Sequence, residues 1–374
     1  MLKTESIAFL VLLLTLYGPI GYAQSSISGE LKNLPPGNLR LIHEEDINRK
    51  KSRLIAEIPM DKFGRFYYKA KLSPHIYSLR LNDNSSIMLA IDKGQKIVIK
   101  GASTNSSSWK VTGSEDTKIL RDYESFRKSS LDRLVNSVRN DIRQLKQKGI
   151  SDNDSTIAKL TELEVVNYEL HRDELIHFIK TRMGTSLAVY PTSIRWSGEK
   201  NILFLARLAK EFEAAHPLTE IAAKINEKVK ILQSNSVGGK VAEIRLPDKD
   251  GLIMPLSAVE ARYILIDFWA SWCPPCRKES TLLASLYQRF ESEGFEIYGV
   301  SLDSAKDAWL KAIDRDKRTW INVSNFQGFE TPVSFDYAVT SLPTNVLIDS
   351  SGQVIARNLH GNDLEELIEK LFLK

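Results

Sequence analysis

Cys273 and Cys276 are the only cysteines among the 374 residues of this sequence, and they lie in the run Trp272-Cys273-Pro274-Pro275-Cys276. An apolar, strand-like segment precedes the pair, and we expect the pair to open a helix. The thiolate is the reactive form of cysteine, and a helix N-terminus lowers the pKa of the first thiol in a Cys-X-X-Cys pair. The two thiols can therefore cycle between a dithiol and a disulfide, which predicts sulfur redox chemistry.

Two other uses of the pair are a purely structural disulfide and half of a zinc site. A four-thiolate zinc site needs two more cysteines, and the sequence has none. His171 and His177 are far from the pair in sequence. They lie six residues apart on a predicted helix, so their side chains do not share one face of it. We therefore favour the redox role and expect neither a metal nor a cofactor.

Asp267 is a polar residue inside the apolar segment from Tyr263 to Trp269, six residues before Cys273. Burial raises the pKa of a carboxyl group. Asp267 could therefore accept a proton near Cys276. The alternative is a polar residue that merely ends the strand.

The elements that must position these residues alternate between strand and helix from about residue 238 to the C-terminus. Strands are predicted at 263–269, 295–302, 345–348 and 353–356, the last two as a hairpin around Ser350-Ser351-Gly352. Helices are predicted after the cysteine pair, after a capping box that begins at Ser304, and over 364–372. Such alternation predicts an α/β sheet that helices cover on both faces.

The residues before 238 show two different sequence patterns. Residues 24–112 contain short runs rich in β-branched and aromatic residues, separated by turn residues, which predicts a β-sandwich. Its strands are expected at 39–42, 65–68, 76–79, 87–91 and 96–99. In residues 113–237 apolar side chains recur at helical spacing, which predicts a central α-helical region of four or five helices. The length of the chain itself favours two or three domains.

The N-terminus has the pattern of a secretory signal. Lys3 supplies positive charge, residues 7–17 are almost unbroken in apolar side chains, and Gly21-Tyr22-Ala23 offers small residues for cleavage before Gln24. The apolar run is shorter than the roughly 20 residues that span a bilayer, although an uncleaved anchor is an alternative. We expect residues 1–23 to be a signal peptide, and export would place the cysteines where disulfides persist.

The bulk composition limits the partners of the chain. Hydrophobic residues make up 43% and charged residues 26%, as in ordinary soluble proteins, and the formal net charge is only +4. No dense Lys/Arg block is interleaved with aromatic residues. We therefore expect no nucleic-acid partner.

Residues 267–276 strongly resemble the active-site strand and loop of the thioredoxin fold. With the signal peptide, the long leader over 241–256 and the proline-rich cysteine pair, they make the chain similar to the exported TlpA/ResA-type thiol-disulfide oxidoreductases. This resemblance covers about residues 238–374. Residues 24–112 also resemble a β domain often fused ahead of such modules in Gram-negative envelope proteins.

The resemblance implies a role for each residue of the motif. Cys273 matches the exposed nucleophile, and Cys276 matches the resolving thiol. Pro275 holds the geometry of the loop between them. Together with Pro274 and Trp272, it would form part of the surface that meets the substrate.

A second segment is implied to lie beside the cysteines. Pro343, in the run Ser341-Leu342-Pro343-Thr344, matches the cis-proline that thioredoxin folds place opposite the pair, and a trans turn is the alternative. Leu342 would present its backbone and apolar side chain to the substrate. Glu279 matches a functional glutamate of ResA-like proteins, but a solvated first-turn acid that favours the helix dipole is an equal alternative.

The implied function is a periplasmic thiol-disulfide oxidoreductase that acts on protein thiols or disulfides of the cell envelope, preferably as a reductase. Thioredoxins carry Asp at the position of Asp267, whereas many TlpA/ResA-like proteins carry Asn. At this position the chain therefore differs from many members of the TlpA/ResA group and is like the thioredoxins, which are efficient reductases. A reductant in an oxidising compartment needs electrons. The resemblance therefore implies a membrane donor of the DsbD/CcdA type, with cytochrome c maturation as one use.

Four alternatives stay open. An oxidase or isomerase would have the same motif at a higher reduction potential. A peroxidase is suggested by the leader over 241–256, but its Pro-x-x-x-Thr-x-x-Cys setting is absent from 266–273. The chain could also be an envelope binding protein with an auxiliary redox domain, in which Tyr67, Tyr68 and Tyr77 contact a ligand, or a scaffold with a vestigial redox centre.

Overall fold

The computed structural model describes residues 24–34, 37–82, 85–151, 154–196 and 200–373. The predicted signal peptide, 1–23, lies outside the described residues. The chain divides into two compact units, the first containing the residues up to Glu44 and Arg53–Leu120, and the second containing Glu45–Ser52 and Arg121–Lys374. The domain limits proposed from the sequence, at 112/113 and 237/238, stay predictions.

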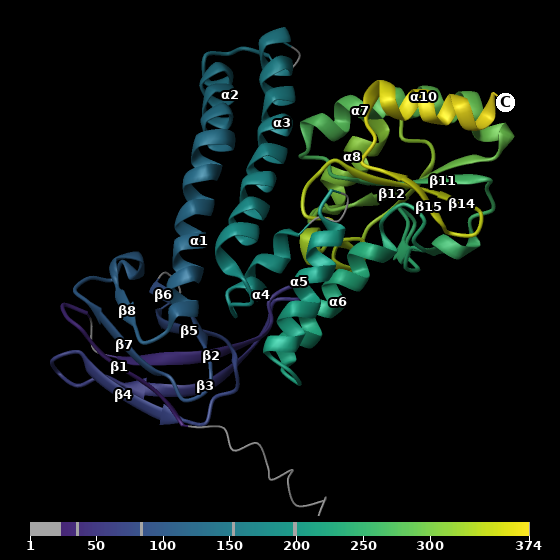
Figure 1. The fold of residues 1–374 in the computed structure, drawn as a ribbon. Coiled ribbons are helices and arrows are strands. Elements are labelled where there is room, and N and C mark those ends of the chain that lie inside the picture. The colour runs from purple at the N-terminus through teal and green to yellow at the C-terminus, as the bar shows by residue number, and fades with distance from the viewer. Residues whose placement is uncertain (1–23, 35–36, 83–84, 152–153, 197–199, 374) are drawn as a thin grey trace, which may run out of the picture. The chain divides into compact units, whose positions relative to one another are not determined.

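Two four-stranded sheets build the first unit (Figure 1). The first sheet has the order β4-β1-β7-β8, with strands Arg65–Ala70, Ser25–Leu31, Lys96–Gly101 and Lys110–Thr112. The second has the order β3-β2-β5-β6, with strands Lys51–Pro59, Asn38–Asp46, His75–Asn82 and Ser85–Ile91. Strand β1 pairs antiparallel with β4 and parallel with β7.

Side chains from both sheets meet in one hydrophobic core. Ile27 and Ile99 come from the first sheet, Leu41 and Leu79 from the second, and all four are fully buried. The five predicted strands are confirmed, while the sandwich arrangement itself stays a prediction. Strands β1, β3 and β8 were not predicted, because Ser25–Leu31 and Lys51–Pro59 carry many polar residues and Lys110–Thr112 is only three residues long.

The three tyrosines that the binding-protein alternative assigned to ligand contact lie in different surroundings. Tyr77 is buried in the core, at 2% exposed, and Tyr68 packs against its edge. Tyr67 is 64% exposed. The three tyrosines therefore do not together form an exposed binding stripe.

Helices dominate the first part of the second unit. They are α1 (Glu115–Leu131, which begins in the first unit), α2 (Ser137–Gln147), α3 (Ser155–Phe178), α4 (Val189–Thr192), α5 (Ile202–Ala215) and α6 (Glu220–Ser234). A π-helical segment, Asp132–Asn136, joins α1 to α2, and a second one, Ile179–Met183, extends α3. The helical region predicted from apolar spacing is confirmed, although its described residues form six α-helices where four or five were predicted.

A five-stranded mixed sheet forms the centre of the C-terminal part, in the order β13-β12-β11-β14-β15. Its strands are Ile321–Val323, Phe295–Ser301, Tyr263–Trp269, Thr344–Asp349 and Val354–Arg357. The central strand β11 runs parallel to β12 and antiparallel to β14. A small two-stranded sheet, β9 (Arg245–Pro247) with β10 (Ile253–Pro255), precedes it.

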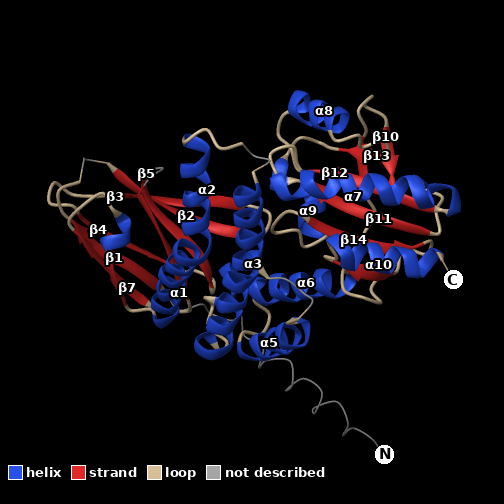
Figure 2. Ribbon diagram, turned by 90° about the horizontal axis from the view of Figure 1, so that it is seen from above, coloured by secondary structure: helices blue, strands red, loops and turns tan. Residues whose placement is uncertain are grey.

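Helices cover both faces of the five-stranded sheet. Leu265 packs on one face against α7 (Pro274–Phe290) and α10 (Gly361–Phe372), which lie over the strands in Figure 2. Ile264 and Ile266 pack on the other face in a core that also contains Val333 of α9 (Pro332–Asp336). Successive side chains of a strand point to opposite faces, so β11 serves both cores. The predicted α/β architecture of this region is confirmed.

Several local predictions for this region differ from the structure. The helix α8 (Lys306–Arg315) begins after Ala305, and no side chain caps it, so the predicted capping box at Ser304 is wrong. The predicted hairpin is confirmed as the antiparallel pair β14 and β15. The strands β9, β10 and β13 and the helix α9 were not predicted, because each has only three to five residues and too few apolar positions to show a period.

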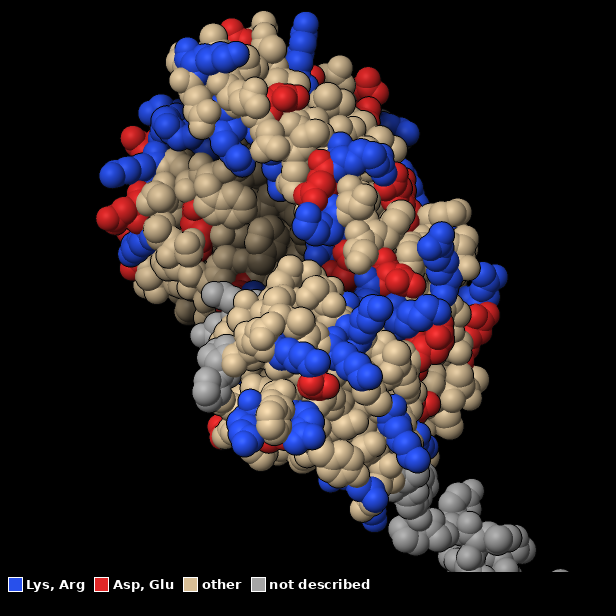
Figure 3. Space-filling model, turned by 90° about the vertical axis from the view of Figure 1, so that its left-hand side faces the viewer, with Lys and Arg blue, Asp and Glu red and all other residues tan. Residues whose placement is uncertain are grey.

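Charges of both signs are interspersed on the face shown in Figure 3, where Lys and Arg side chains alternate with Asp and Glu among neutral residues. This distribution agrees with the small net charge of +4. Within the described part of the chain, no helix combines the length and apolar content needed to cross a membrane.

Candidate functional site

Cys273 and Cys276 form a disulfide at the N-terminus of α7. Cys273 is the residue immediately before the helix, and its Sγ accepts a hydrogen bond from the backbone N–H of Cys276 at 3.3 Å. Pro274 and Pro275 occupy the first two helical positions. Backbone N–H groups have no intrahelical partner there, so proline costs no hydrogen bond and presets the helical φ.

Both sulfur-bearing residues are buried. Cys273 is 4% exposed and Cys276 3% exposed, and they share a small core cluster with Trp269, Trp309 and Ala312. The predicted exposure of Cys273 is therefore wrong for this disulfide state. Cys273 caps the helix and packs onto the tryptophans below it, so its sulfur does not project into solvent.

The loop between β11 and the cysteines is fixed by Asp303. The backbone N–H and hydroxyl of Ser271 both donate to its carboxylate, at 3.0 Å and 2.6 Å, and the hydroxyl of Ser301 donates at 2.8 Å. Asp303 is 1% exposed. These contacts hold the segment that carries Trp272 and Cys273, a role that the sequence did not reveal.

The Leu342–Pro343 peptide bond is cis, as the resemblance implied. It lies directly before β14, the strand that pairs with β11. Leu342 packs against the cluster that contains both cysteines. The structure therefore brings the predicted segment beside the disulfide.

Trp272 lies on the surface next to the buried disulfide, with 55% of its area exposed. Its ring centroid is 6.3 Å from that of Phe329, which is 42% exposed and lies in the short 3₁₀ turn Gly328–Glu330. Phe329 was not predicted as a site residue, because it is far from the cysteines in the sequence and no local pattern links it to them. The two rings, here called the aromatic pair, form an exposed apolar surface that includes the residue directly before Cys273.

Asp267 lies in the middle of β11 and is 3% exposed. It shares the α7 side of the sheet with Leu265, because residues two apart in a strand face the same way. Its carboxylate forms an ion pair with Arg318, whose side chain is fully buried. Burial raises the pKa of Asp267, and the Arg318 guanidinium opposes that rise. The strand-end alternative is therefore wrong.

Arg318 is a further site residue that the sequence did not predict. It lies between α8 and β13 in the polar run Arg315-Asp316-Lys317-Arg318, which has the appearance of a solvated turn. In the structure its guanidinium stacks at 3.8 Å over the Trp269 ring and donates to the Ser280 hydroxyl at 2.6 Å. No pattern within the sequence would have separated it from its exposed neighbours.

Glu279 lies three residues after Cys276, and only 9% of its side chain is exposed. Both of its carboxylate oxygens lie within hydrogen-bond distance of His360 Nδ1, at 2.9 Å and 3.0 Å. The alternative of a solvated first-turn acid is therefore wrong. Its neighbour Lys278 is exposed and ion-paired with Glu162 of α3 at 2.6 Å.

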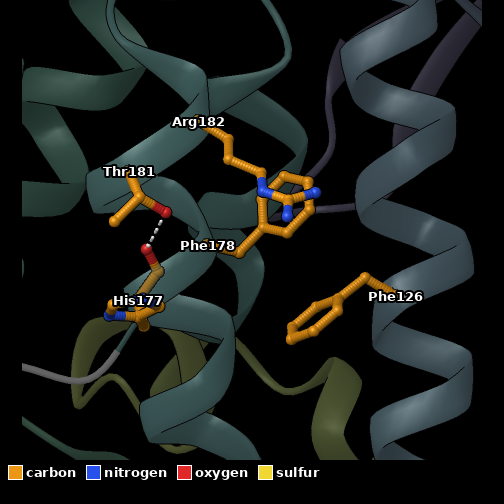
Figure 4. Close-up of a pocket in the computed structure, with 5 residues that line it drawn as sticks. All are labelled: Phe126, His177, Phe178, Thr181 and Arg182. Atoms are coloured by element: carbon orange, nitrogen blue, oxygen red, sulfur yellow. Dashed lines mark hydrogen bonds between the residues drawn. The ribbon is translucent and has the colours of Figure 1, made fainter.

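A pocket lies in the helical part of the second unit, apart from the cysteines in the sequence. It is lined by Phe126 of α1, by the last two residues of α3 and by two residues of the π-helical segment that extends α3. Figure 4 shows the hydrogen bond from the Thr181 hydroxyl to the His177 carbonyl, whose length is 2.8 Å. The lining residues are Phe126, His177, Phe178, Thr181 and Arg182. The pocket contains neither a thiol nor a carboxylate, so its lining offers no group for redox chemistry.

His171 and His177, the histidines of the zinc alternative, lie in different surroundings. His171 is buried, and its Nδ1 lies 2.8 Å from the hydroxyl of Ser130. His177 is exposed at the pocket. The arrangement at α7 is that of a thioredoxin-fold redox centre, because a Cys-X-X-Cys pair opens the helix and the cis Leu342–Pro343 bond lies beside it.

Comparison with known proteins gives matches over the C-terminal part of the chain. Residues 237–357 match the AhpC/TSA family. The thiol-disulfide oxidoreductase ResA of Bacillus subtilis is 31% identical over 134 residues, which is 33% of this chain and 67% of ResA. The ResA of Geobacillus kaustophilus is 30% identical over 139 residues, covering 36% of this chain and 78% of that protein.

Solved structures include the thioredoxin domain of a thiol-disulfide oxidoreductase from Bacteroides vulgatus, 34% identical, which aligns with 36% of this chain and 97% of that chain at a TM-score of 0.35. On the ResA similarities, the chain belongs to the ResA-type thiol-disulfide oxidoreductases. It is a thiol-disulfide oxidoreductase, and its redox domain lies in the C-terminal third of the sequence.

Proposed function

We propose that the protein exchanges its Cys273–Cys276 dithiol/disulfide with protein substrates of the cell envelope, acting as a reductase. The observation that carries this proposal is the cysteine pair at the N-terminus of α7 beside the cis Leu342–Pro343 bond. The ResA-type relatives support the reaction class.

The proposed reaction has two exchange steps. The Cys273 thiolate attacks one sulfur of a substrate disulfide, a mixed disulfide forms, and the other substrate sulfur leaves as a thiolate. Cys276 then loses its proton to Asp267 and attacks the Cys273 sulfur. The mixed disulfide breaks, the second substrate sulfur leaves as a thiolate, and the enzyme becomes the disulfide seen here.

Asp267 supports the reductase direction, since an efficient proton acceptor beside the resolving thiol speeds the release of reduced substrate. To act repeatedly, the enzyme would receive two electrons from a membrane donor of the DsbD/CcdA type. Reduction of proteins in cytochrome c maturation is one use that fits this chemistry.

The proposed location is the periplasm or cell envelope. The apolar run and small residues of 1–23 support export through a cleaved signal peptide. A β-sandwich over 24–112 and a helical region over 113–237 would then accompany the redox domain over 238–374. An envelope-binding role of 24–235 would appear as capture of envelope proteins or glycans by redox-inactive protein.

The reduction potential of the Cys273–Cys276 couple tests the direction. Equilibration of the full chain against glutathione or dithiothreitol buffers should give a value near the roughly −270 mV of thioredoxin. A value near the roughly −120 mV of DsbA would make the protein an oxidant or isomerase and overturn the reductase assignment. Thiols that do not equilibrate at all would indicate a vestigial centre.

Asp267→Asn should slow the resolving step by about a hundredfold at neutral pH, which lies within the usual contribution of a general base. The pKa of Asp267 in the folded protein is raised above the ordinary aspartate value of about 3.9. In the wild type, the rate of the resolving step should therefore fall as the pH drops through that raised pKa. The asparagine variant should lack that pH step. Stopped-flow traces at several pH values check this, and equal slowing of attack and resolution would contradict the assigned role.

Phe329→Ala should raise the KM for protein disulfide substrates a few-fold, about 1 kcal/mol of binding, by removing one ring of the aromatic pair. The reaction with a small disulfide should not change, because a small molecule does not span both rings. Phe63→Ala is the matched control, since Phe63 is also exposed, at 58%, but belongs to the first unit. An equal rise of KM in both variants would exclude a specific role for the pair.

A further inference from the structure

The guanidinium of Arg318 is the most completely buried charge at the redox centre, with none of its side-chain area exposed. It stacks between two tryptophans, with its Cζ 3.8 Å from the centre of the Trp269 ring and 4.9 Å from that of Trp320. Arginine cannot be deprotonated in a protein. A buried guanidinium therefore needs an anion, and Asp267 supplies it.

The same guanidinium also reaches the helix that carries Cys276. Its second terminal nitrogen donates to the hydroxyl of Ser280 at 2.6 Å, and that hydroxyl donates to the backbone carbonyl of Cys276 at 3.2 Å. Cys276 and Ser280 lie four residues apart, so they share the buried face of α7. Arg318 thus joins the carboxylate of β11 to the helical turn of the resolving cysteine.

We propose that Arg318 is a positioning residue for the resolving step, because it holds the Asp267 carboxylate ionised and fixed relative to the turn of α7 that carries Cys276. This inference rests on the proposed exchange function. In that step the proton of the Cys276 thiol passes to Asp267, and the Cys276 thiolate attacks the Cys273 sulfur. The Cys273–substrate bond breaks, and the substrate sulfur takes the electron pair as a thiolate.

Other charged groups act on Asp267 from the elements packed around it. Glu279 of α7 raises the pKa of Asp267, and His360, directly before α10, lowers it. Arg318 opposes the effect of burial more strongly than His360 does. Removing the guanidinium should therefore raise the pKa of Asp267, so that less of the carboxylate is available as a base at a given pH.

The test separates the two exchange steps in the full-length, reduced protein. With 5,5′-dithiobis(2-nitrobenzoate) as the probe, attack by Cys273 releases one coloured thiolate, and resolution by Cys276 releases the second. Arg318→Met should slow the second release by about tenfold or more and shift its pH midpoint upward, with the first release unchanged. Arg318→Lys, which keeps a cation, should restore part of the rate.

Two further variants distinguish a positioning role from a general loss of stability in Arg318→Met. Arg289→Met removes an arginine that lies on α7 itself and pairs with Glu365 and Glu369 instead of Asp267, and it should leave both releases unchanged. In an Asp267→Asn background, Arg318→Met should cause little further slowing, because a residue that acts through Asp267 has nothing left to position.

The outcomes distinguish this inference from the function on which it rests. Equal slowing of both releases by Arg318→Met, or slowing that adds in full to that of Asp267→Asn, would overturn the positioning role. A wild-type protein that releases no thiolate would instead contradict the exchange function itself. Selective, pH-shifted slowing that disappears in the asparagine background would support the proposal.

Discussion

Replacing Cys273 by serine should abolish thiol–disulfide exchange, with a loss of roughly a thousandfold or more in rate. A serine hydroxyl is not ionised at neutral pH and cannot form a disulfide, so the first attack has no nucleophile. Turnover of a protein disulfide by the purified protein checks this, with dithiothreitol as the electron source. Activity that survives in Cys273→Ser would show that another group performs the exchange.

Cys276→Ser should behave differently, because the attack by Cys273 remains and only the resolution is lost. The variant should accumulate mixed disulfides with its substrates, which a reducing agent releases. Mass spectrometry of the trapped species in a periplasmic extract would identify the substrate proteins. Cys273→Ser is the matched control and should trap far less, whereas equal trapping by both variants would argue against the order of the two cysteines.

Asp267→Leu should destabilise the redox domain by about 3–5 kcal/mol, because it leaves the buried guanidinium of Arg318 without its anion. Urea unfolding of the full chain should show the transition of this domain at a clearly lower midpoint. The effect should be present in both the disulfide and dithiol states, since the ion pair itself does not involve sulfur.

The double variant Asp267→Leu/Arg318→Met is the control for this prediction. It replaces both buried ions with apolar side chains of similar volume, which is often neutral or stabilising in proteins. Most of the stability lost in Asp267→Leu should therefore return. A double variant as unstable as the single one would mean that the loss comes from packing around Trp269 and Trp320 and not from the unpaired charge.

Local sequence patterns were sufficient for the elements around the cysteines. The strand over 263–269 is a long apolar run, and the Cys-Pro-Pro-Cys segment combines a capping position with prolines suited to the first turn of a helix. Both signals lie within a few residues of each other, so neighbouring side chains determine them. The very short elements, such as β13 and α9, were not predicted, because they are stabilised by tertiary packing and show no local hydrophobic period.

Contacts between distant segments could not be predicted in this way. Phe329 reaches Trp272, and His360 reaches Glu279 across 81 positions of the sequence. The exposure of Cys273 also depended on its packing against Trp309 of a later helix, which is why the expected exposed thiol is buried. Each of these features depends on which segments the fold brings together.

The sequence by itself determined the chemistry of this protein. The motif that carries the chemistry, a single Cys-X-X-Cys pair after a strand of buried type, is made of residues that are neighbours in the sequence. The tertiary structure decided how that chemistry is controlled. Arg318 stands among charged residues that look like a surface turn, yet the fold buries it against Asp267 and Ser280. Burial of a charge is favourable only where distant groups offset its loss of hydration, and those groups are assembled only when the chain folds.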